Sequence, residues 1–240
     1  MEVLVENNIC PICNNDGYVT EDRDGAKEFI GFCSCAVGKA KKTEMWQQKL
    51  TEAGILEEYW PLKFSNFIPQ NTFVSHMQFL KALETYMLTI HAKRTEGGIW
   101  LILGTAGTGK TLGASLVLKE ALKKDYTCRY EVWGEIIDEA FLPVTEQDAQ
   151  LQHRHKTVDF LVIDDLGKDK IMKDSDFKKN LLEKLLKHRF SKKLPTILIS
   201  TLDMAELYHK FPVLASMIAP TNISRVQGIN FRTSIDLRRP

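Results

Sequence analysis

From residue 99 onward, short apolar runs alternate with longer segments in which apolar residues recur every three or four positions. The runs have the length and composition of buried strands, and the periodic segments have the pattern of amphipathic helices. Strands are expected near residues 99–104, 126–133, 158–165, 195–201 and 223–226, with helices near 112–124, 135–141, 177–190, 204–210 and 213–218. This alternation predicts an α/β fold with a parallel sheet flanked by helices and ligands at the carboxyl ends of its strands.

The first third of the chain has a different pattern. Residues 18–20 and 29–32 are expected to form the two strands of a hairpin, residues 37–60 a helix, and residues 76–93 an amphipathic helix. Three segments are therefore predicted: a small N-terminal domain over residues 1–60, a linker over 61–75, and an α/β domain over 76–240. The polar stretch 145–157 is open to three interpretations, a solvated helix, a metal site or a nucleic-acid contact, of which the solvated helix is preferred.

Bulk composition excludes little. The formal net charge is +1 with 26% charged residues, so the overall charge gives no indication of binding to nucleic acid or to a membrane. The charge is unevenly distributed, however, because residues 166–193 carry ten bases against four acids. The N-terminus lacks the apolar core of a signal peptide, and no run reaches the ~18 apolar residues of a membrane span. A cytoplasmic location without membrane contact is expected, where thiols stay reduced and clustered cysteines favour metal.

A phosphate-binding loop follows the first strand of the α/β segment. It matches the pattern G-x-x-x-x-G-K-[ST] in the required order of strand, loop and helix. Glycines let the backbone N–H groups face a polyphosphate, the lysine supplies a positive charge to the outer phosphates, and the threonine hydroxyl is a ligand for Mg²⁺. The alternative is a glycine-rich turn without a ligand, but every fixed position is filled. ATP is the expected ligand, bound by Gly104, Thr105, Ala106, Gly107, Thr108, Gly109, Lys110 and Thr111.

A second motif completes the predicted nucleotide site. The apolar strand 158–165 ends in Asp164 and Asp165, about fifty residues after the loop. Asp164 is expected to hold Mg²⁺ together with Thr111, and Asp165 to orient or deprotonate the attacking water. A buried strand that stops at a polar turn would look similar, but the pairing with the loop makes ATP hydrolysis the favoured interpretation.

Four of the five cysteines lie near the N-terminus, as Cys10 and Cys13 in a C-x₂-C pair and Cys33 and Cys35 in a C-x-C pair. Two thiolate pairs match a tetrahedral, structural Zn²⁺ site, and the intervening hairpin gives the pattern of a zinc ribbon. A domain this small buries too little apolar surface to be stable without a metal or a covalent cross-link. The alternative is four unrelated reduced cysteines. Cys128, within a predicted strand, is expected to be a buried small hydrophobe.

Together these motifs resemble a known family. The cysteine cluster, the loop at 104–111, the strand and turn at 161–167, the segments 195–196 and 200–204, and the Gly-x-x-x-Arg pattern at 228–232 are similar to the AAA+ helicase loaders of the DnaC/DnaI type, bacterial or phage, which are related to IstB-like ATPases. The resemblance covers residues 62–240 well and the cysteine region more loosely.

The resemblance implies an ATP-dependent loader of the replicative DNA helicase, acting in replication initiation. Its N-terminal domain would bind the DnaB-type helicase hexamer, and its AAA+ domain would bind ATP and single-stranded DNA, with self-assembly or an oligomer templated on the helicase ring. It also places Thr201 at the sensor-1 position and Arg232 at the sensor-2 position, which reaches the γ-phosphate in such proteins.

The chain departs from the family pattern in two places. Sensor 1 is usually asparagine, whereas Thr201 has a hydroxyl and no amide. In this family an arginine finger reaches the nucleotide site of a neighbouring subunit, and its expected position falls near Ser216, where the chain has no arginine. Either another residue such as Arg189 serves as the finger, or hydrolysis is reduced. An ATPase with slow turnover is therefore predicted.

DNA contacts are expected from basic residues after the second motif. The candidates are Arg154, Lys168, Lys170 and Lys173, whose phosphate contacts would weaken steeply with salt. Two alternatives remain: an IstB-like ATPase partner of a transposase, and a helicase-binding module with weak ATPase activity. The identity of the helicase, the oligomeric state and the source of the arginine finger are left open by the sequence.

Overall fold

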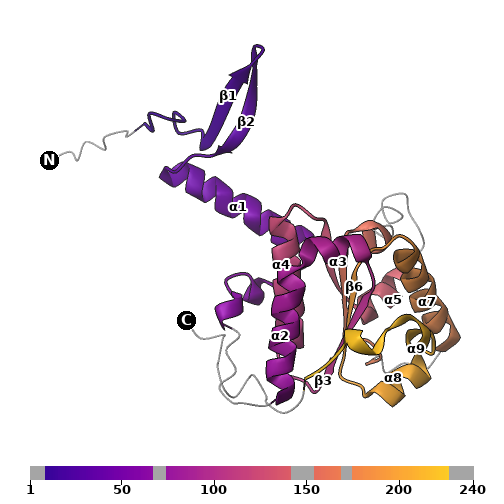
Figure 1. Cartoon of the computed structure of the whole chain (residues 1–240). Coiled ribbons are helices and arrows are strands. Elements are labelled where there is room, and N and C mark those ends of the chain that lie inside the picture. The colour runs from indigo at the N-terminus through magenta and orange to yellow at the C-terminus, as the bar shows by residue number, and fades with distance from the viewer. Residues whose placement is uncertain (1–8, 67–73, 142–153, 169–174, 227–240) are drawn as a thin grey trace. The chain divides into compact units, whose positions relative to one another are not determined.

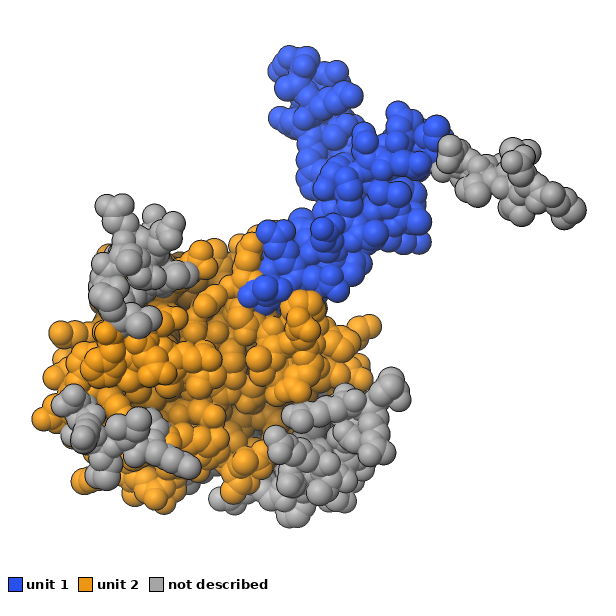
Figure 2. Space-filling view, turned by 180° about the vertical axis from the view of Figure 1, so that it is seen from behind, with its two compact units in different colours: residues 1–51 blue, residues 52–240 orange. Residues whose placement is uncertain are grey.

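The computed structural model describes residues 9–66, 74–141, 154–168 and 175–226 (Figure 1). The chain divides into two compact units, residues 1–51 and residues 52–240, which are coloured separately in Figure 2. We refer to them as unit 1 and unit 2. The assignment of residues 1–60 to a helicase-binding domain, followed by a linker, stays a prediction. Within the described ranges, no helix is long and apolar enough to cross a bilayer.

Unit 1 contains the predicted hairpin. Strands β1 (Tyr18–Arg23) and β2 (Ala26–Phe32) pair antiparallel, and Asp24 and Gly25 form the turn with φ of 53° and 80°. Positive φ at both central positions matches the twist of the flanking strands and is tolerated by Asp and Gly. The long helix α1 (Ala36–Glu52) follows.

The predicted α/β fold of unit 2 is confirmed. Five parallel strands lie in the order β4-β5-β6-β3-β7, with bounds β3 (Ile99–Gly104), β4 (Cys128–Val132), β5 (Phe160–Asp164), β6 (Thr196–Ser200) and β7 (Ile223–Val226). Every residue of β5 and β6 is buried, which explains their uninterrupted apolar sequences. The central position of β6, between the P-loop strand β3 and the Asp-Asp strand β5, brings the ends of all three together.

Helices and short 3-10 turns precede and connect these strands. The helices are α2 (Val74–Leu88), α3 (Ile90–Glu96), α4 (Lys110–Lys123), α5 (Trp133–Phe141), α7 (Ser175–Ser191), α8 (Met204–Lys210) and α9 (Val213–Met217), and the 3-10 turns are η1 (Glu57–Tyr59), η2 (Phe64–Asn66) and η3 (Pro220–Asn222). The helix expected near residues 204–210 is α8, and its N-cap is Asp203, whose side chain accepts from Glu206 N at 2.8 Å in a capping box.

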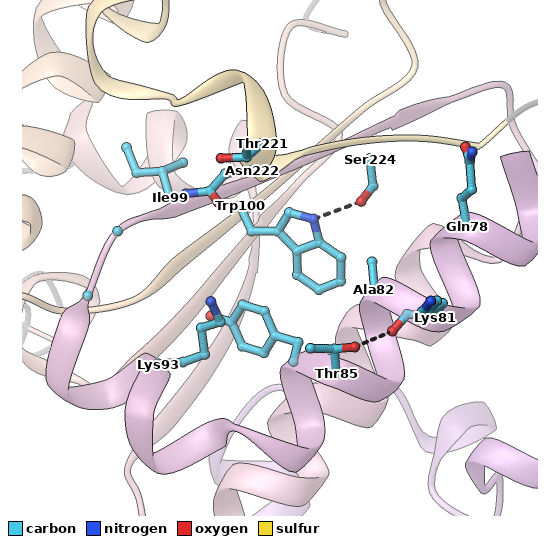
Figure 3. Close-up of a pocket in the computed structure, with 13 residues that line it drawn as sticks. Gln78, Lys81, Ala82, Thr85, Lys93, Ile99, Trp100, Thr221, Asn222 and Ser224 are labelled. Atoms are coloured by element: carbon cyan, nitrogen blue, oxygen red, sulfur yellow. Dashed lines mark hydrogen bonds between the residues drawn. The ribbon is translucent and has the colours of Figure 1, made fainter.

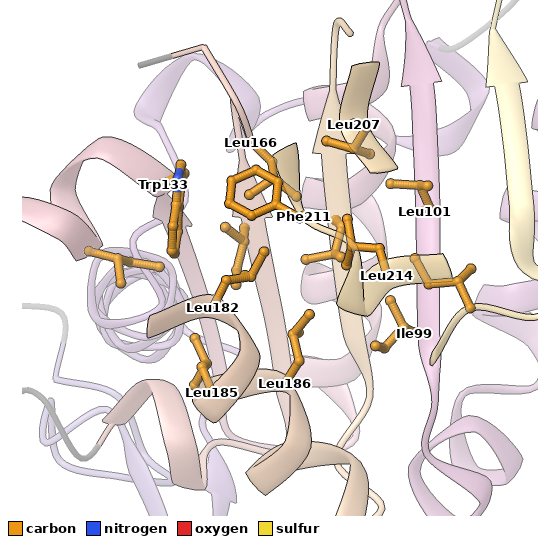
Figure 4. Packing of buried hydrophobic residues seen from close by; sticks show 14 of the residues in the cluster. Ile99, Leu101, Trp133, Leu166, Leu182, Leu185, Leu186, Leu207, Phe211 and Leu214 are labelled. Atoms are coloured by element: carbon orange, nitrogen blue, oxygen red, sulfur yellow. The ribbon is translucent and has the colours of Figure 1, made fainter. Parts of the chain in front are cut away.

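Side chains alternate between the two faces of the sheet, as the period of two requires. On one face, Leu101 of β3 and Leu161 of β5 join residues of α5, α7, α8 and α9 in a single apolar cluster (Figure 4). On the other face, Trp100 of β3 contacts Phe79 and Tyr86 of α2. The alternation puts Asp164 on the opposite face from the Figure 4 cluster, toward α4.

Two helix predictions need correction. The helix expected over 37–60 ends at Glu52, because Gly54 adopts φ of 71° and turns the chain. The helix expected over 76–93 is interrupted at Thr89, whose ψ of 24° separates α2 from α3. The strand expected over 126–133 is also shorter, because Trp133 is already the first residue of α5.

Candidate nucleotide site and cysteine cluster

The P-loop connects β3 to α4 through backbone conformations that favour glycine. Gly104, Gly107 and Gly109 have φ of 157°, 80° and 83°. A side chain at Gly107 or Gly109 would meet its own backbone in this left-handed region, so these positions need glycine. Gly109 stands directly before the first residue of α4, so the loop delivers the chain to a helix N-terminus, the feature that favours an anion.

Lys110 is held inside this loop. Its side chain is 6% exposed, and Nζ donates to the carbonyl oxygen of Thr105 at 2.7 Å. Burial lowers the pKa of Lys110 to about 8, while the negative charge of Asp164 acts in the opposite direction. The ammonium group is therefore poorly solvated and satisfied by a loop carbonyl, an arrangement in which a phosphate oxygen would be a stronger acceptor.

The carboxylate of Asp164 connects the two motifs. Thr111 Oγ1 donates to Asp164 Oδ2 at 2.6 Å, and the backbone N–H of Asp165 donates to Oδ1, also at 2.6 Å. A third donor, Tyr130 OH, reaches Oδ2 at 2.8 Å. Asp164 is 5% exposed, and these three hydrogen bonds compensate for the burial of its carboxylate. The paired threonine and aspartate oxygens are hard ligands of the kind that Mg²⁺ prefers.

Tyr130 was missed by the sequence analysis. It lies on β4, where it pairs with Val162, and it therefore shares a face of the sheet with Asp164 two residues further along β5. Burial, followed by the charge of Asp164, raises the pKa of Tyr130, so the hydroxyl stays protonated and donates. A tyrosine in a strand is ordinarily read as a core residue, and only the strand order shows that it faces the carboxylate.

Asp165, the candidate base, follows directly. It has φ of 55°, which turns the chain away from β5, and its side chain is 44% exposed. Oδ1 accepts from Lys168 Nζ at 2.6 Å. Lys168, an expected DNA contact, is therefore engaged in an ion pair with Asp165. Its ammonium competes for the carboxylate oxygen that would accept a proton from water.

The remaining site predictions have mixed outcomes. Thr201 directly follows β6, one strand away from β5, at the same edge of the sheet as Asp164. Arg232 lies outside the described residues, as do Lys170 and Lys173, and Arg154 is exposed. Their roles stay predictions.

Arg189 cannot be an arginine finger. It is fully buried in α7, and its guanidinium donates to Thr196 Oγ1 at 2.9 Å and to the carbonyl oxygens of His155, Val158, Asp159 and Pro195. Burial lowers the pKa of Arg189 to about 9, although the charge of Asp159 opposes that effect. Five acceptors fix this side chain within its own subunit, so the suggestion that it reaches a neighbour is wrong.

The prediction of a solvated helix over 145–157 can be compared with the structure from residue 154 onward, because residues 142–153 lie outside the described part. For His155 this prediction is wrong. His155 is 6% exposed, with Nε2 3.0 Å from Glu139 Oε2 and Nδ1 3.6 Å from Glu131 Oε1. The ring packs between β4 and α5 rather than facing water. The neighbouring residues Arg154, Lys156 and Thr157 are exposed, so His155 is the buried member of an otherwise solvated helical turn.

The four N-terminal cysteines meet in unit 1. All four Sγ atoms lie within 4.8 Å of one another, and the pairs Cys10–Cys33 and Cys13–Cys35 are each 3.6 Å apart. Zn–S bonds of about 2.3 Å in a tetrahedron would separate sulfurs by about 3.8 Å, so the cluster fits zinc and is too open for a disulfide.

Backbone N–H groups donate hydrogen bonds to sulfur atoms of this cluster. Gly17 N donates to Cys13 Sγ at 3.3 Å and Gly38 N to Cys35 Sγ at 3.4 Å. Backbone N–H groups of Cys13 and Ile12 lower the pKa of Cys10 to about 6. The pKa of Cys33 moves the other way, to about 12, because the lowering effect of the backbone N–H of Cys35 is outweighed by burial and the neighbouring thiols. Cys128 is buried in unit 2, where burial raises its pKa, so it is a packing residue as predicted.

A separate cavity of about 380 Å³ opens at the amino-terminal end of β3, between α2, α3 and η3 (Figure 3). Tyr86 stacks on Trp100 with ring centroids 4.9 Å apart, and Trp100 Nε1 donates to Ser224 Oγ at 3.0 Å, so the indole wall is fixed. Lys81 and Lys93 line the cavity as well. The P-loop begins at the other end of β3, so this cavity is not the candidate nucleotide site.

Comparison with known proteins agrees with this geometry, although no protein-family model matches the chain. The chain is 30% identical over 207 residues to the replicative helicase loader DnaI of Bacillus subtilis (strain 168), a match that covers 83% of this chain and 64% of that protein. The chain thus spans somewhat less than two thirds of the length of DnaI.

Solved structures show the fold. A DnaC helicase loader superposes with a TM-score of 0.57 at 19% identity, covering 71% of this chain and 99% of that one. A structure of DnaI superposes with a TM-score of 0.56 at 19% identity, covering 74% of this chain and 94% of that one. A primosome component from Streptococcus pyogenes serotype M3 superposes with a TM-score of 0.55 at 17% identity, covering 74% of this chain and 92% of that one. The chain is thus similar in sequence to DnaI, and its α/β fold is similar to the folds of the solved DnaC and DnaI helicase loaders, in agreement with the resemblance of its motifs.

Proposed function

We propose that this protein is an ATP-dependent loader of a replicative DNA helicase. The observation that carries the proposal is the 2.6 Å hydrogen bond between Thr111 Oγ1 and Asp164 Oδ2, which joins the two nucleotide motifs across 53 residues of sequence. The similarity to DnaI supports the loader role, since that relative is named as a replicative helicase loader.

The nucleotide site would act through charge and positioning. The N–H groups of the P-loop and Lys110 would bind the phosphates of ATP, with Thr111 and Asp164 holding Mg²⁺. Bound Mg²⁺ would supply charge neutralisation at the phosphates. Asp165 would orient the attacking water and take its proton, and Thr201 and Arg232 would contact the terminal phosphate region.

Slow turnover is part of the proposal. Asp165 Oδ1 accepts a hydrogen bond from Lys168 Nζ at 2.6 Å, so Lys168 would compete with the attacking water for this oxygen. The ATPase would therefore behave as a switch rather than as a motor. Displacement of Lys168 by a phosphate of bound DNA would free Asp165, which gives single-stranded DNA a route to stimulate hydrolysis.

Unit 1 would provide the contact with the helicase ring. A Cys₄ zinc site has no open coordination position, so its role would be structural, to hold the hairpin in place. Beside the cluster, the hairpin exposes Phe29 and Ile30, each 56% accessible, and such apolar side chains are typical of a protein-binding surface.

The test is a pull-down with the purified chain as bait in lysate of its source cell, with ATP, followed by identification of the captured proteins. The wild type is compared with Lys110→Ala and with the pair Cys10→Ser, Cys13→Ser. Recovery of the replicative helicase by the wild type, and its loss in the cysteine variant, is the expected result. Recovery of a transposase, or of DNA without helicase, would refute the loader role and favour the IstB-like alternative.

A further inference from the structure

The first residues of unit 2 are fastened to the sheet behind the nucleotide site. We call residues 53–62 the strap. Ala53 O accepts a hydrogen bond from Tyr130 N at 2.7 Å, so the strap pairs with the outer edge of β4, the terminal strand of the sheet. Lys119 of α4 fastens the other end of the strap by donating to the carbonyl oxygens of Tyr59, Trp60 and Leu62.

Gly54 allows the strap to approach β4 this closely. It has φ of 71°, and a Cβ atom at this position would lie 2.6 Å from the carbonyl oxygen of Tyr130. Real Cβ atoms do not come that near to a backbone oxygen. Any larger residue at position 54 would displace either the strap or the backbone of Tyr130. The position of Tyr130 therefore depends on the position of the strap.

The side chain of Tyr130 continues this connection to the nucleotide site. Its hydroxyl donates to Asp164 Oδ2 at 2.8 Å, on the same oxygen that Thr111 contacts. Thr111 is itself a candidate metal ligand, so its hydroxyl has two tasks. The Tyr130 hydroxyl comes from a different strand, β4, so it fixes the carboxylate from an independent direction.

Resting on the proposed ATPase function, we propose that Tyr130 is a positioning residue for Asp164 and that the strap holds Tyr130 in place. A carboxylate with donors from α4, β4 and the turn after β5 cannot rotate about its terminal bond without losing one of them. Its oxygen would thereby be held in one orientation for a bound Mg²⁺, as hydrogen bonds to metal ligands do in general.

The experiment compares Tyr130→Phe with Tyr86→Phe, a buried tyrosine of α2 that does not contact Asp164. Calorimetry gives the dissociation constant for ATP with and without Mg²⁺, and a steady-state assay gives kcat as a function of Mg²⁺. In Tyr130→Phe, we expect the Mg²⁺-dependent gain in affinity and kcat to fall about tenfold, which corresponds to about 1.4 kcal/mol. Affinity for ATP without Mg²⁺ and all values for Tyr86→Phe should stay within twofold of the wild type.

A second pair of variants tests the strap. Gly54→Ala is expected to reproduce the Mg²⁺ defect of Tyr130→Phe. Gly98→Ala is the control, because Gly98 also has positive φ, at 104°, but a Cβ there would meet nothing within 4 Å. Loss of thermal stability in both, with the Mg²⁺ defect in Gly54→Ala alone, supports the coupling.

The outcomes are distinguishable. If the wild type binds no ATP, the proposed function fails and this inference falls with it. If the wild type binds and hydrolyses ATP but Tyr130→Phe retains the full effect of Mg²⁺ and differs only in melting temperature, Tyr130 is a packing residue and the inference alone is overturned. A normal Mg²⁺ response in Gly54→Ala would overturn the role of the strap.

Discussion

The contact between Lys119 and the strap gives a quantitative prediction about stability. Lys119 is 8% exposed, and its Nζ donates to the carbonyl oxygens of Tyr59, Trp60 and Leu62 at 3.0, 2.7 and 2.6 Å. The substitution Lys119→Met keeps the length of the side chain and removes the ammonium group. All three carbonyl groups then lose their donor.

The magnitude follows from the burial of those acceptors. The hydrogen bond to the Leu62 carbonyl is buried, whereas those to Tyr59 and Trp60 are partly exposed. In the variant, the carbonyl groups of Tyr59 and Trp60 can therefore bind water instead. An unsatisfied buried polar group costs about 1–3 kcal/mol, and the two wetter ones cost less. We expect Lys119→Met to lower the free energy of unfolding of unit 2 by about 3 kcal/mol. Tryptophan fluorescence during urea unfolding measures it.

The matched control is Lys123→Met, one helical turn further along α4. Lys123 has a 58% exposed side chain and an ion pair with Glu120 at 3.1 Å, which is worth little at a surface. Its substitution should change stability by less than about 0.5 kcal/mol. Equal effects of the two substitutions would refute the view that the strap is clamped by Lys119.

The pH dependence provides an independent check of the same residue. Burial lowers the pKa of Lys119 to about 8, whereas an unfolded lysine titrates near 10.4. Between these values the unfolded chain binds more protons than the folded one, so stability rises with pH. The wild type should therefore gain stability relative to Lys119→Met from pH 8 to about pH 10. A pH-independent difference would show that the buried amine does not titrate as described.

Three further predictions concern other parts of the chain. Cys13→Ser should release bound zinc, measured with a chromophoric chelator, while Cys128→Ser retains it; retention in both would refute the Cys₄ site. Arg189→Met should destabilise unit 2 by about 3 kcal/mol or more in urea unfolding, because five acceptors lose a buried donor, and Lys187→Met should be nearly neutral; a small effect at Arg189 would restore the finger hypothesis. Lys110→Ala should weaken ATP binding at least about tenfold in calorimetry without lowering the melting temperature, and unchanged affinity would exclude the P-loop as the binding site.

The local motifs were predictable because their chemistry is carried by neighbouring residues. The P-loop needs glycines, a lysine and a threonine in consecutive positions, and Gly107 and Gly109 do take the left-handed conformations that glycine favours. The start of α8 is also set locally, because Asp203 accepts from the backbone N–H of Glu206 only three residues away. The spacing of the four cysteines likewise indicated that they would meet, and all four thiols do lie together.

The errors arose where a side chain's environment is set by distant segments. Arg189 is in a basic stretch and looked available, but Thr196, Pro195 and the chain around Val158 surround it. His155 lies in a polar run, yet glutamates from β4 and α5 enclose it.

By itself, the sequence determined the alternation of strands and helices, the P-loop and the cysteine cluster, because hydrophobic periodicity and backbone conformation are local properties. Only the tertiary structure decided what surrounds Asp164. The register of β4 against β5 brings Tyr130 to the carboxylate, and the strap comes to lie behind it across about 75 residues of sequence. Strand order depends on which elements bury the most apolar surface together, and that sum over the whole chain cannot be read from any one segment.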